Sequence, residues 1–191
     1  MRRNLIQELV KVLPPPSKPL DTDESLLVRL ETCTRTPFPA DFIEFGKVYG
    51  SGQIKSAYSW EVWSPFRSTY PLIILEFART WELFRDAMEL GNEPFRIFPQ
   101  VGGLLPFAQS DGGDWVCWET VGEPDEWGVV DIYSLDEGQY ERLDMGFSEY
   151  FYNVLTRKTV LNRHREGDSW NPETDLSFSA VAYNYQDEHL L

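Results

Sequence analysis

Residues 104–118 read LLPFAQSDGGDWVCW, a pattern of two apolar runs separated by a short polar turn. Glycines flanked by aspartates, as in DGGD at 111–114, are typical of tight turns between adjacent strands. Side chains alternate between the two faces of a strand, and in the second run both faces are apolar. One face carries Trp115 and Cys117, and the other carries Val116 and Trp118. We therefore predict a central strand that other elements cover on both sides.

Further strands are expected on both sides of this pair. Branched and aromatic residues bounded by turn residues favour strands at 127–133 and 139–143, joined by a turn at 136–138. The aromatic stretch 54–63 favours one or two strands, and the apolar run 178–185 favours an edge strand. The sheet is therefore expected to hold about five or six strands.

Helical periodicity, with apolar residues three and four apart, marks several segments. They are residues 3–13, 21–30, 39–49, 71–90 and 147–157. Asp21 and Glu24 have the three-residue spacing of a capping box, so we expect Asp21 to cap the second of these helices. Pro71 suits the first turn of the fourth helix, although residues 72–75 would also fit a strand.

The chain is strongly acidic, and its acidity is concentrated. The 31 Asp and Glu residues outnumber the 17 Lys and Arg residues, which gives a formal net charge of −14. Residues 101–150 hold 12 of the acids and one base, Arg142, for a net charge of −11. Such a surface repels nucleic acid and anionic lipid and attracts basic partners. The segment indicates either an acidic, aromatic interaction face or buried aromatics among acids that keep the protein in solution.

The chain shows no sign of export or membrane insertion. Gln7, Glu8 and Lys11 interrupt the apolar stretch of a signal peptide, and no run approaches the roughly 18 apolar residues of a membrane span. Cys33 and Cys117 are expected to be reduced packing residues. A chain of 191 residues buries enough surface to need no disulfide or metal. We therefore expect a cytoplasmic protein.

The residues give little support to catalysis. His164 lies among arginines and His189 lies near the end of the sequence, so neither is expected to act as an oriented base. Motifs for nucleotide or zinc chemistry are absent from the sequence. Glycosidases pair two carboxylates, so acids among tryptophans leave a carbohydrate-active or glycan-binding protein as a distant alternative. The DGGD segment lacks the alternating ligands of a calcium loop, and we expect no metal or other cofactor.

Three blocks of the sequence resemble the SUKH superfamily, the Smi/Knr-like proteins. The most telling is LLPFAQSDGGDW at 104–115, in which an apolar-Pro-Phe-Ala strand precedes a polar turn, Gly-Asp and a second strand. PADFIEFGKVYGSG at 39–52 is similar to the family's proline-led helix, and residues 148–155 match its closing helix loosely. The segment 130–137 departs from the family pattern, because it contains no histidine.

The resemblance implies a single α+β domain in which helices pack around a mostly antiparallel sheet. It covers residues 21–157, which leaves residues 1–20 as an N-terminal helix and proline-rich linker and residues 158–191 as a C-terminal extension. It also implies a non-enzymatic role, because many bacterial members bind and neutralise a cognate polymorphic toxin, often a nuclease. Fungal members are regulatory scaffolds, which is the alternative function.

Two sets of residues follow from these expectations. The first is expected to be structural and consists of Pro106, Phe107, Ala108, Gly113, Asp114 and Trp115. The second is expected to contact a basic toxin, because carboxylates attract cationic active sites and tryptophan is enriched at binding hot spots. It consists of Trp118, Glu119, Asp125, Glu126, Trp127, Asp131, Asp136 and Glu137.

Overall fold

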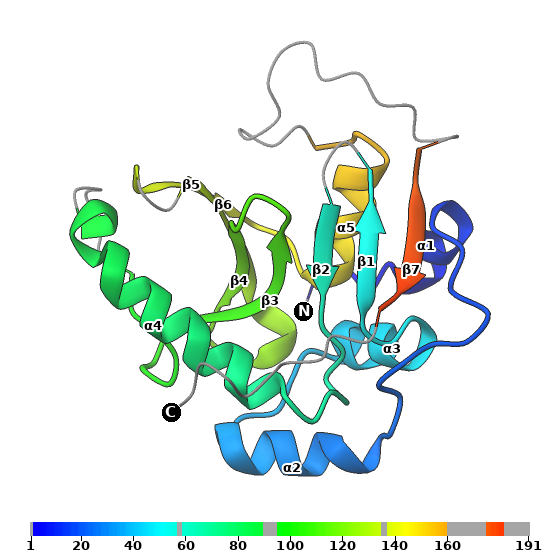
Figure 1. Cartoon of the computed structure of the whole chain (residues 1–191), viewed down its shortest axis with the longest axis horizontal. Helices are drawn as coiled ribbons and strands as arrows, with labels where there is room; N and C mark the ends of the chain where they lie inside the picture. Colours follow the sequence, from blue (N-terminus) through cyan, green and yellow to red (C-terminus); the bar gives the residue numbers. More distant parts are fainter. Residues whose placement is uncertain (1, 57–58, 90–94, 135–136, 160–174, 182–191) are drawn as a thin grey trace.

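The computed structural model describes residues 2–56, 59–89, 95–134, 137–159 and 175–181. Within these residues a seven-stranded antiparallel sheet has the order β6-β5-β4-β3-β2-β1-β7 (Figure 1). The strands are β1 Gly52–Lys55, β2 Ser59–Val62, β3 Leu104–Ser110, β4 Trp115–Glu119, β5 Gly128–Ser134, β6 Gln139–Leu143 and β7 Ser177–Ala180. The α+β fold is confirmed. The strand count exceeds the expected five or six because the aromatic stretch forms two strands and β7 adds an edge.

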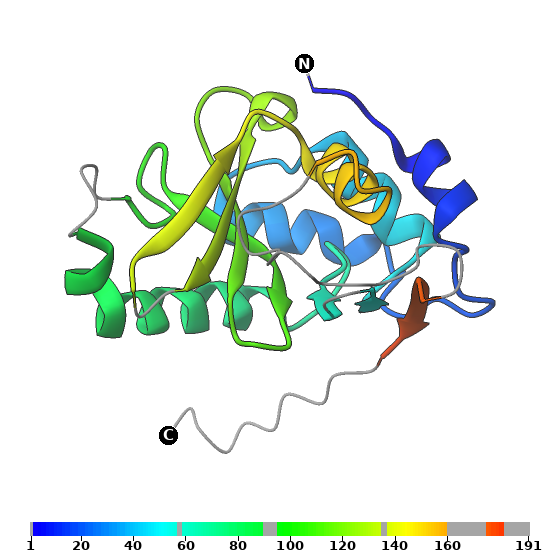
Figure 2. The same cartoon turned by 90° about the horizontal axis from the view of Figure 1, so that it is seen from above.

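Helices cover both faces of the sheet, as the apolar pattern of β4 predicts. They are α1 Ile6–Val12, α2 Ser25–Thr34, α3 Ala40–Val48, α4 Tyr70–Glu89 and α5 Phe147–Leu155, with a 3-10 turn, η1, at Pro124–Glu126. Trp118 of β4 contacts Phe42 of α3, with ring centroids 4.8 Å apart. Trp115, on the opposite face of β4, contacts Phe77 of α4 at 5.0 Å. Phe147 of α5 also lies on the Trp118 side, with ring centroids 6.1 Å apart, so α4 and α5 are on opposite sides of the strands (Figure 2). Residues 72–75 are helical.

The Pro106–Phe107 pair forms an irregular point in β3 that the core depends on. The β3–β4 register shifts between Pro106 and Ala108, which suits a proline because it has no N–H to donate to the ladder. The Pro106 carbonyl accepts a hydrogen bond from the Tyr70 hydroxyl at 2.7 Å. Phe107 is fully buried, and its ring lies 4.6 Å from that of Trp118. The pair is therefore structural.

The DGGD segment is the predicted tight turn between β3 and β4. The Ser110 N–H donates to the Asp114 carbonyl at 2.8 Å, and the Asp114 N–H donates to the Ser110 hydroxyl at 3.2 Å. Gly113 has a φ of +87°, a left-handed conformation that favours glycine. Trp115 then begins β4 inside the core.

The predicted capping box of α2 is wrong. The helix begins at Ser25, and the Asp23 carboxylate accepts hydrogen bonds from the Ser25 N–H at 3.1 Å and the Ser25 hydroxyl at 2.7 Å. Asp21 instead has a left-handed backbone with φ +54°, and its carbonyl accepts from the Ser64 hydroxyl at 2.7 Å. A contact with a distant loop therefore overrides the local signal.

Segments at both ends of the chain contribute to the core. The first helix buries Ile6, Leu9 and the following Leu13, whose carbonyl accepts from the Tyr49 hydroxyl at 2.6 Å. At the other end, β7 pairs with β1 and places the Phe178 ring 5.1 Å from the Tyr49 ring. The predicted edge strand is confirmed at Ser177–Ala180, and residues 182–185 of that run lie outside the described residues.

Candidate functional site

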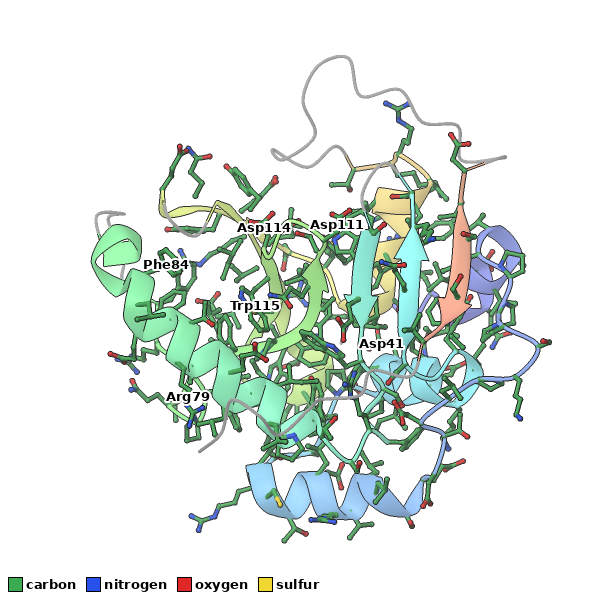
Figure 3. All side chains as sticks on the ribbon, in the orientation of Figure 1. Asp41, Arg79, Phe84, Asp111, Asp114 and Trp115 are labelled. Atoms are coloured by element: carbon green, nitrogen blue, oxygen red, sulfur yellow. The ribbon has the colours of Figure 1, made fainter. Side chains whose placement is uncertain are left out.

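Eight of the 12 acidic residues of 101–150 lie at the two ends of the sheet. The β3–β4 turn and the β5–β6 turn lie at one end and carry Asp111, Asp114 and Glu137. The β4–β5 connection and the β6–α5 connection lie at the opposite end and carry Glu119, Glu123, Asp125, Glu126 and Asp144. Figure 3 shows Asp111 and Asp114 together at the first end. We call residues 119–127 the acidic loop.

The structure brings together only part of the predicted contact set. Glu119, Asp125 and Glu126 lie together in the acidic loop, whereas Glu137 lies at the other end of the sheet and Asp136 lies outside the described residues. The side chains of three further residues in the set are buried, so a partner cannot touch them in this conformation. They are Trp118, Trp127 and Asp131, with relative exposures of 0%, 3% and 0%.

The tryptophans of this region build the core and position the acidic loop. The Trp118 ring packs 4.6 Å from Phe107 and 5.9 Å from Trp127. The Trp127 indole N–H donates to the Gly122 carbonyl at 3.2 Å, which ties the loop to the core. The surface formed by this segment is therefore acidic but not aromatic, because these tryptophans are buried in the sheet. This agrees with the alternative in which aromatic residues are buried among surface acids.

Asp131 is a buried partner of the closing helix. Its carboxylate accepts a hydrogen bond from the Tyr150 hydroxyl of α5 at 2.8 Å. Burial raises the pKa of the neighbouring Cys117 thiol well above its ordinary value, and the negative charge of Asp131 adds to that rise. A hydrogen-bonded carboxylate in this place fixes α5 against β5.

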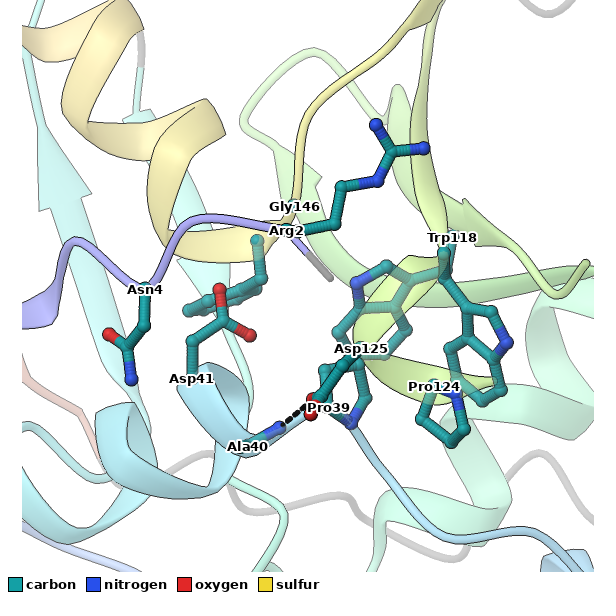
Figure 4. A pocket seen from close by; sticks show the side chains of 11 residues that line it. Arg2, Asn4, Pro39, Ala40, Asp41, Trp118, Pro124, Asp125 and Gly146 are labelled. Atoms are coloured by element: carbon teal, nitrogen blue, oxygen red, sulfur yellow. Dashed lines mark hydrogen bonds between the residues drawn. The ribbon is translucent and has the colours of Figure 1, made fainter. Parts of the chain in front are cut away.

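A small pocket beside the acidic loop contains two carboxylates that hold helix ends (Figure 4). The Asp125 carboxylate accepts from the Ala40 N–H in the first turn of α3 at 2.8 Å. The Asp41 carboxylate accepts from the Ser148 N–H of α5 at 2.8 Å. Burial raises the pKa of Asp41, the charge of Asp125 adds to the rise, and the hydrogen bonds from Ser148 oppose it.

The dimensions of this pocket do not suit a sugar. Its volume is about 70 Å³, whereas pockets for small-molecule ligands usually measure about 300–1,000 Å³. Asp41 and Asp125 also bind backbone N–H groups at the N-termini of helices, where a carboxylate is favourable. This carboxylate pair therefore has a structural role.

A larger groove runs between the acidic loop and β6. It has a volume of about 350 Å³, and its charged lining residues are Arg2, Glu119, Glu126, Arg142 and Asp144. Glu119 forms an ion pair with Arg142 at 3.3 Å, and the Arg142 guanidinium lies 4.3 Å from the centre of the Phe95 ring. Arg2 reaches the groove from the N-terminal segment and forms an ion pair with Asp144. Sequence reasoning missed Arg2, because no local pattern connects it to this end of the sheet.

The other side of the acidic loop borders a wide, partly apolar depression of about 800 Å³. Its lining includes Arg35 after α2, Ile74 of α4, and Val101. Two exposed valines lie on loops at this end, Val101 at 82% and Val121 at 59% exposure. An apolar patch bordered by charged residues has the apolar core and polar rim of a protein-binding surface. Sequence reasoning did not single out these valines, because a valine in a glycine-containing loop has no pattern that marks it as exposed.

No group of three or more His, Cys, Asp or Glu side chains suited to a metal ion occurs among the described residues. No helix in the described part of the chain is long and apolar enough to cross a bilayer.

Comparison with known proteins identifies the family. The chain has no significant match among curated proteins or among solved structures. The family model described as SMI1 / KNR4 family (SUKH-1) matches residues 21–153, which include α2 to α4, β1 to β6 and most of α5. The chain belongs to the SMI1 / KNR4 family (SUKH-1).

Proposed function

We propose that this protein is a non-enzymatic immunity protein that binds a cognate protein toxin and neutralises it. Family membership supports a protein-binding role of this kind. The observation that carries the proposal is the acidic loop, two of whose carboxylates, Glu119 and Glu126, line a groove at one end of the sheet. The contact residues we propose are Glu119, Val121, Glu123 and Glu126, whereas the Asp125 carboxylate holds the start of α3.

The charge of this surface suits a basic partner. A toxin that cleaves nucleic acid presents cationic side chains to phosphates, and carboxylates on an inhibitor can occupy the same positions. An acidic surface of this kind raises association rates about 10- to 1,000-fold at low salt. Trp127 and η1 hold the loop against the core, so little conformational entropy is lost when a partner binds.

The proposed place of action is the cytoplasm. Cys33 is exposed and Cys117 is buried in β4, and both are free thiols. Free thiols support a reducing compartment.

The test is affinity capture of the tagged protein from its native lysate at low and high salt, with mass spectrometry of the captured proteins. We expect one dominant basic protein, captured less well at high salt. Expression of that protein alone should stop growth of a bacterial host, and co-expression of the immunity protein should restore growth. Several unrelated partners without toxicity would instead favour a regulatory scaffold.

A matched pair of variants locates the interface. Glu123→Lys with Glu126→Lys reverses two charges in the acidic loop, and Asp111→Lys with Glu137→Lys reverses two at the opposite end of the sheet. Both double variants change the net charge equally, so a general electrostatic effect would weaken capture equally. We expect a loss of more than about tenfold in affinity only for the loop variant. Equal effects of the two variants would contradict the proposed surface.

A further inference from the structure

Arg2 makes polar contacts to three residues at the end of the sheet that carries the acidic loop. Its backbone N–H donates to the Asp125 carbonyl at 2.8 Å. Its Nε donates to the Glu126 carbonyl at 3.1 Å, and its Nη1 forms an ion pair with the Asp144 carboxylate. The guanidinium therefore uses donors on different edges of its plane, which the single point charge of a lysine ammonium does not provide.

Two glycines give the Arg2 side chain room: Gly128 lines the groove, and Gly146 lines the adjoining small pocket beside the Arg2 stem. A Cβ added to Gly146 would lie 2.9 Å from the Arg2 Cβ and 3.4 Å from its Cγ. A Cβ added to Gly128 would lie 3.3 Å from the Arg2 Nη2. Neither glycine has the left-handed backbone that would require glycine for another reason. The space beside these glycines and the hydrogen-bond acceptors of the groove thus both fit an arginine side chain.

We infer that the groove between the acidic loop and β6 is a guanidinium-binding site, which Arg2 occupies in the free protein and an arginine side chain of the partner occupies in the complex. The identity of that partner as a toxin rests on the proposed function. The site itself is defined by the Glu126 carbonyl, the Asp144 carboxylate and Gly128, and Gly146 lies against the Arg2 stem.

The ionic contact of Arg2 is suited to exchange, although the Arg2 side chain itself is only 25% exposed. Its ionic partner, Asp144, has a side chain that is 95% exposed, and exposed ion pairs contribute little to stability. The first helix begins only at Ile6, so Arg2 can leave the groove without unfolding an element. Three carboxylates, two from the acidic loop and one from Asp144, line the groove. Two guanidinium groups balance them while Arg2 is bound, and only that of Arg142 remains when Arg2 leaves. The vacated groove therefore attracts a cation more strongly.

The test uses N-acetyl-arginine amide as the probe and nuclear magnetic resonance as the readout. The probe is titrated into the isotope-labelled full chain as wild type, as Arg2→Ala and as Arg3→Ala. Arg3→Ala is the matched control, because Arg3 is an exposed neighbour outside the groove lining. We expect saturable shifts of the Gly128, Asp144 and Gly146 amides, with affinity about tenfold or more higher in Arg2→Ala than in the other two proteins, since Arg2 no longer competes.

Two further comparisons define the site. N-acetyl-lysine amide should bind Arg2→Ala several-fold more weakly than the arginine probe, and adding Asp144→Asn should abolish the gain. Equal binding of both probes, or no gain in Arg2→Ala, would overturn the inference. Gly146→Ala gives an independent check, because the added methyl displaces the Arg2 segment while Arg2 is retained, and it should also increase arginine binding.

The result of the probe titration does not depend on the identity of the toxin. A positive probe titration with a failed lysate capture would support the guanidinium site and contradict the immunity role. The opposite pair of results would support the immunity role and contradict displacement of Arg2.

Discussion

The carboxylate of Asp41 binds Ser148 twice and so joins the N-termini of two helices that lie 107 residues apart in the sequence. It accepts from the Ser148 N–H at 2.8 Å and from the Ser148 hydroxyl at 2.7 Å. The same hydroxyl oxygen accepts from the Leu5 N–H at 2.9 Å, next to the start of α1. Three helices on one face of the sheet therefore meet at this pair.

Replacement of Asp41 by alanine should lower the free energy of unfolding by about 1–2 kcal/mol. The variant leaves the buried Ser148 N–H at the start of α5 without its acceptor. Urea denaturation followed by tryptophan fluorescence measures the change. Asp41→Asn retains an acceptor oxygen and serves as the control. An alanine variant as stable as the asparagine variant would show that the hydrogen bonds contribute nothing.

The Asp41 carboxyl should also give stability a defined pH dependence. Burial raises its pKa above the ordinary value of 3.8 in the folded protein, so the unfolded chain releases this proton first as pH rises. The wild type should therefore lose stability relative to Asp41→Asn as pH increases from 3.8, until pH passes the raised pKa. Urea midpoints of both proteins across this range measure the difference. A difference that stays constant with pH would contradict the raised pKa.

Phe107→Ala should cost about 3–5 kcal/mol of stability, because the ring is fully buried among other aromatic rings at the β3 bulge. Leu83→Ala is a matched truncation on α4, where the side chain is 82% exposed. It should change stability by less than about 0.5 kcal/mol. Chemical denaturation of both variants provides the comparison, and similar losses would argue against a core role for Phe107.

Tyr150→Phe should lower stability by about 1–3 kcal/mol, because it removes the hydroxyl that donates to the buried Asp131 carboxylate. Tyr152→Phe removes a hydroxyl of the same helix that accepts from Lys158 at 3.0 Å on the surface. Its effect should be below about 0.5 kcal/mol. Thermal unfolding by calorimetry separates the two, and a Tyr150 variant as stable as the wild type would contradict the role of this bond.

The two cysteines should react differently with a thiol reagent. Cys33 is exposed on α2, whereas burial raises the pKa of the Cys117 thiol and keeps reagent away from it. In the native protein we expect one thiol to react rapidly, and the second to react only after denaturant unfolds the chain. Peptide mapping after alkylation identifies each site. Rapid native labelling of Cys117 would be incompatible with its place in β4.

Sequence patterns predicted most of the helices and strands, because those signals are local. The tight turn at 111–114 is predicted from its glycines and aspartates alone. The helices α4 and α5 are predicted from the spacing of apolar residues along one helix face. The capping of α2 was predicted wrongly, because the Ser64 contact to Asp21 comes from a loop far along the chain. The apolar character of both β4 faces already favoured burial of Trp118, which argued against its place in the contact set.

The sequence by itself determined the fold class, the family resemblance and the concentration of acid in residues 101–150. Only the tertiary structure decided which of these acids lie together, because successive antiparallel strands send alternate connections to opposite ends of the sheet. It also decided the placement of Arg2, which contacts Glu126 across 124 residues of sequence. Local periodicity cannot predict such a contact, because the contact forms only when the sheet has assembled and α1 has packed against it.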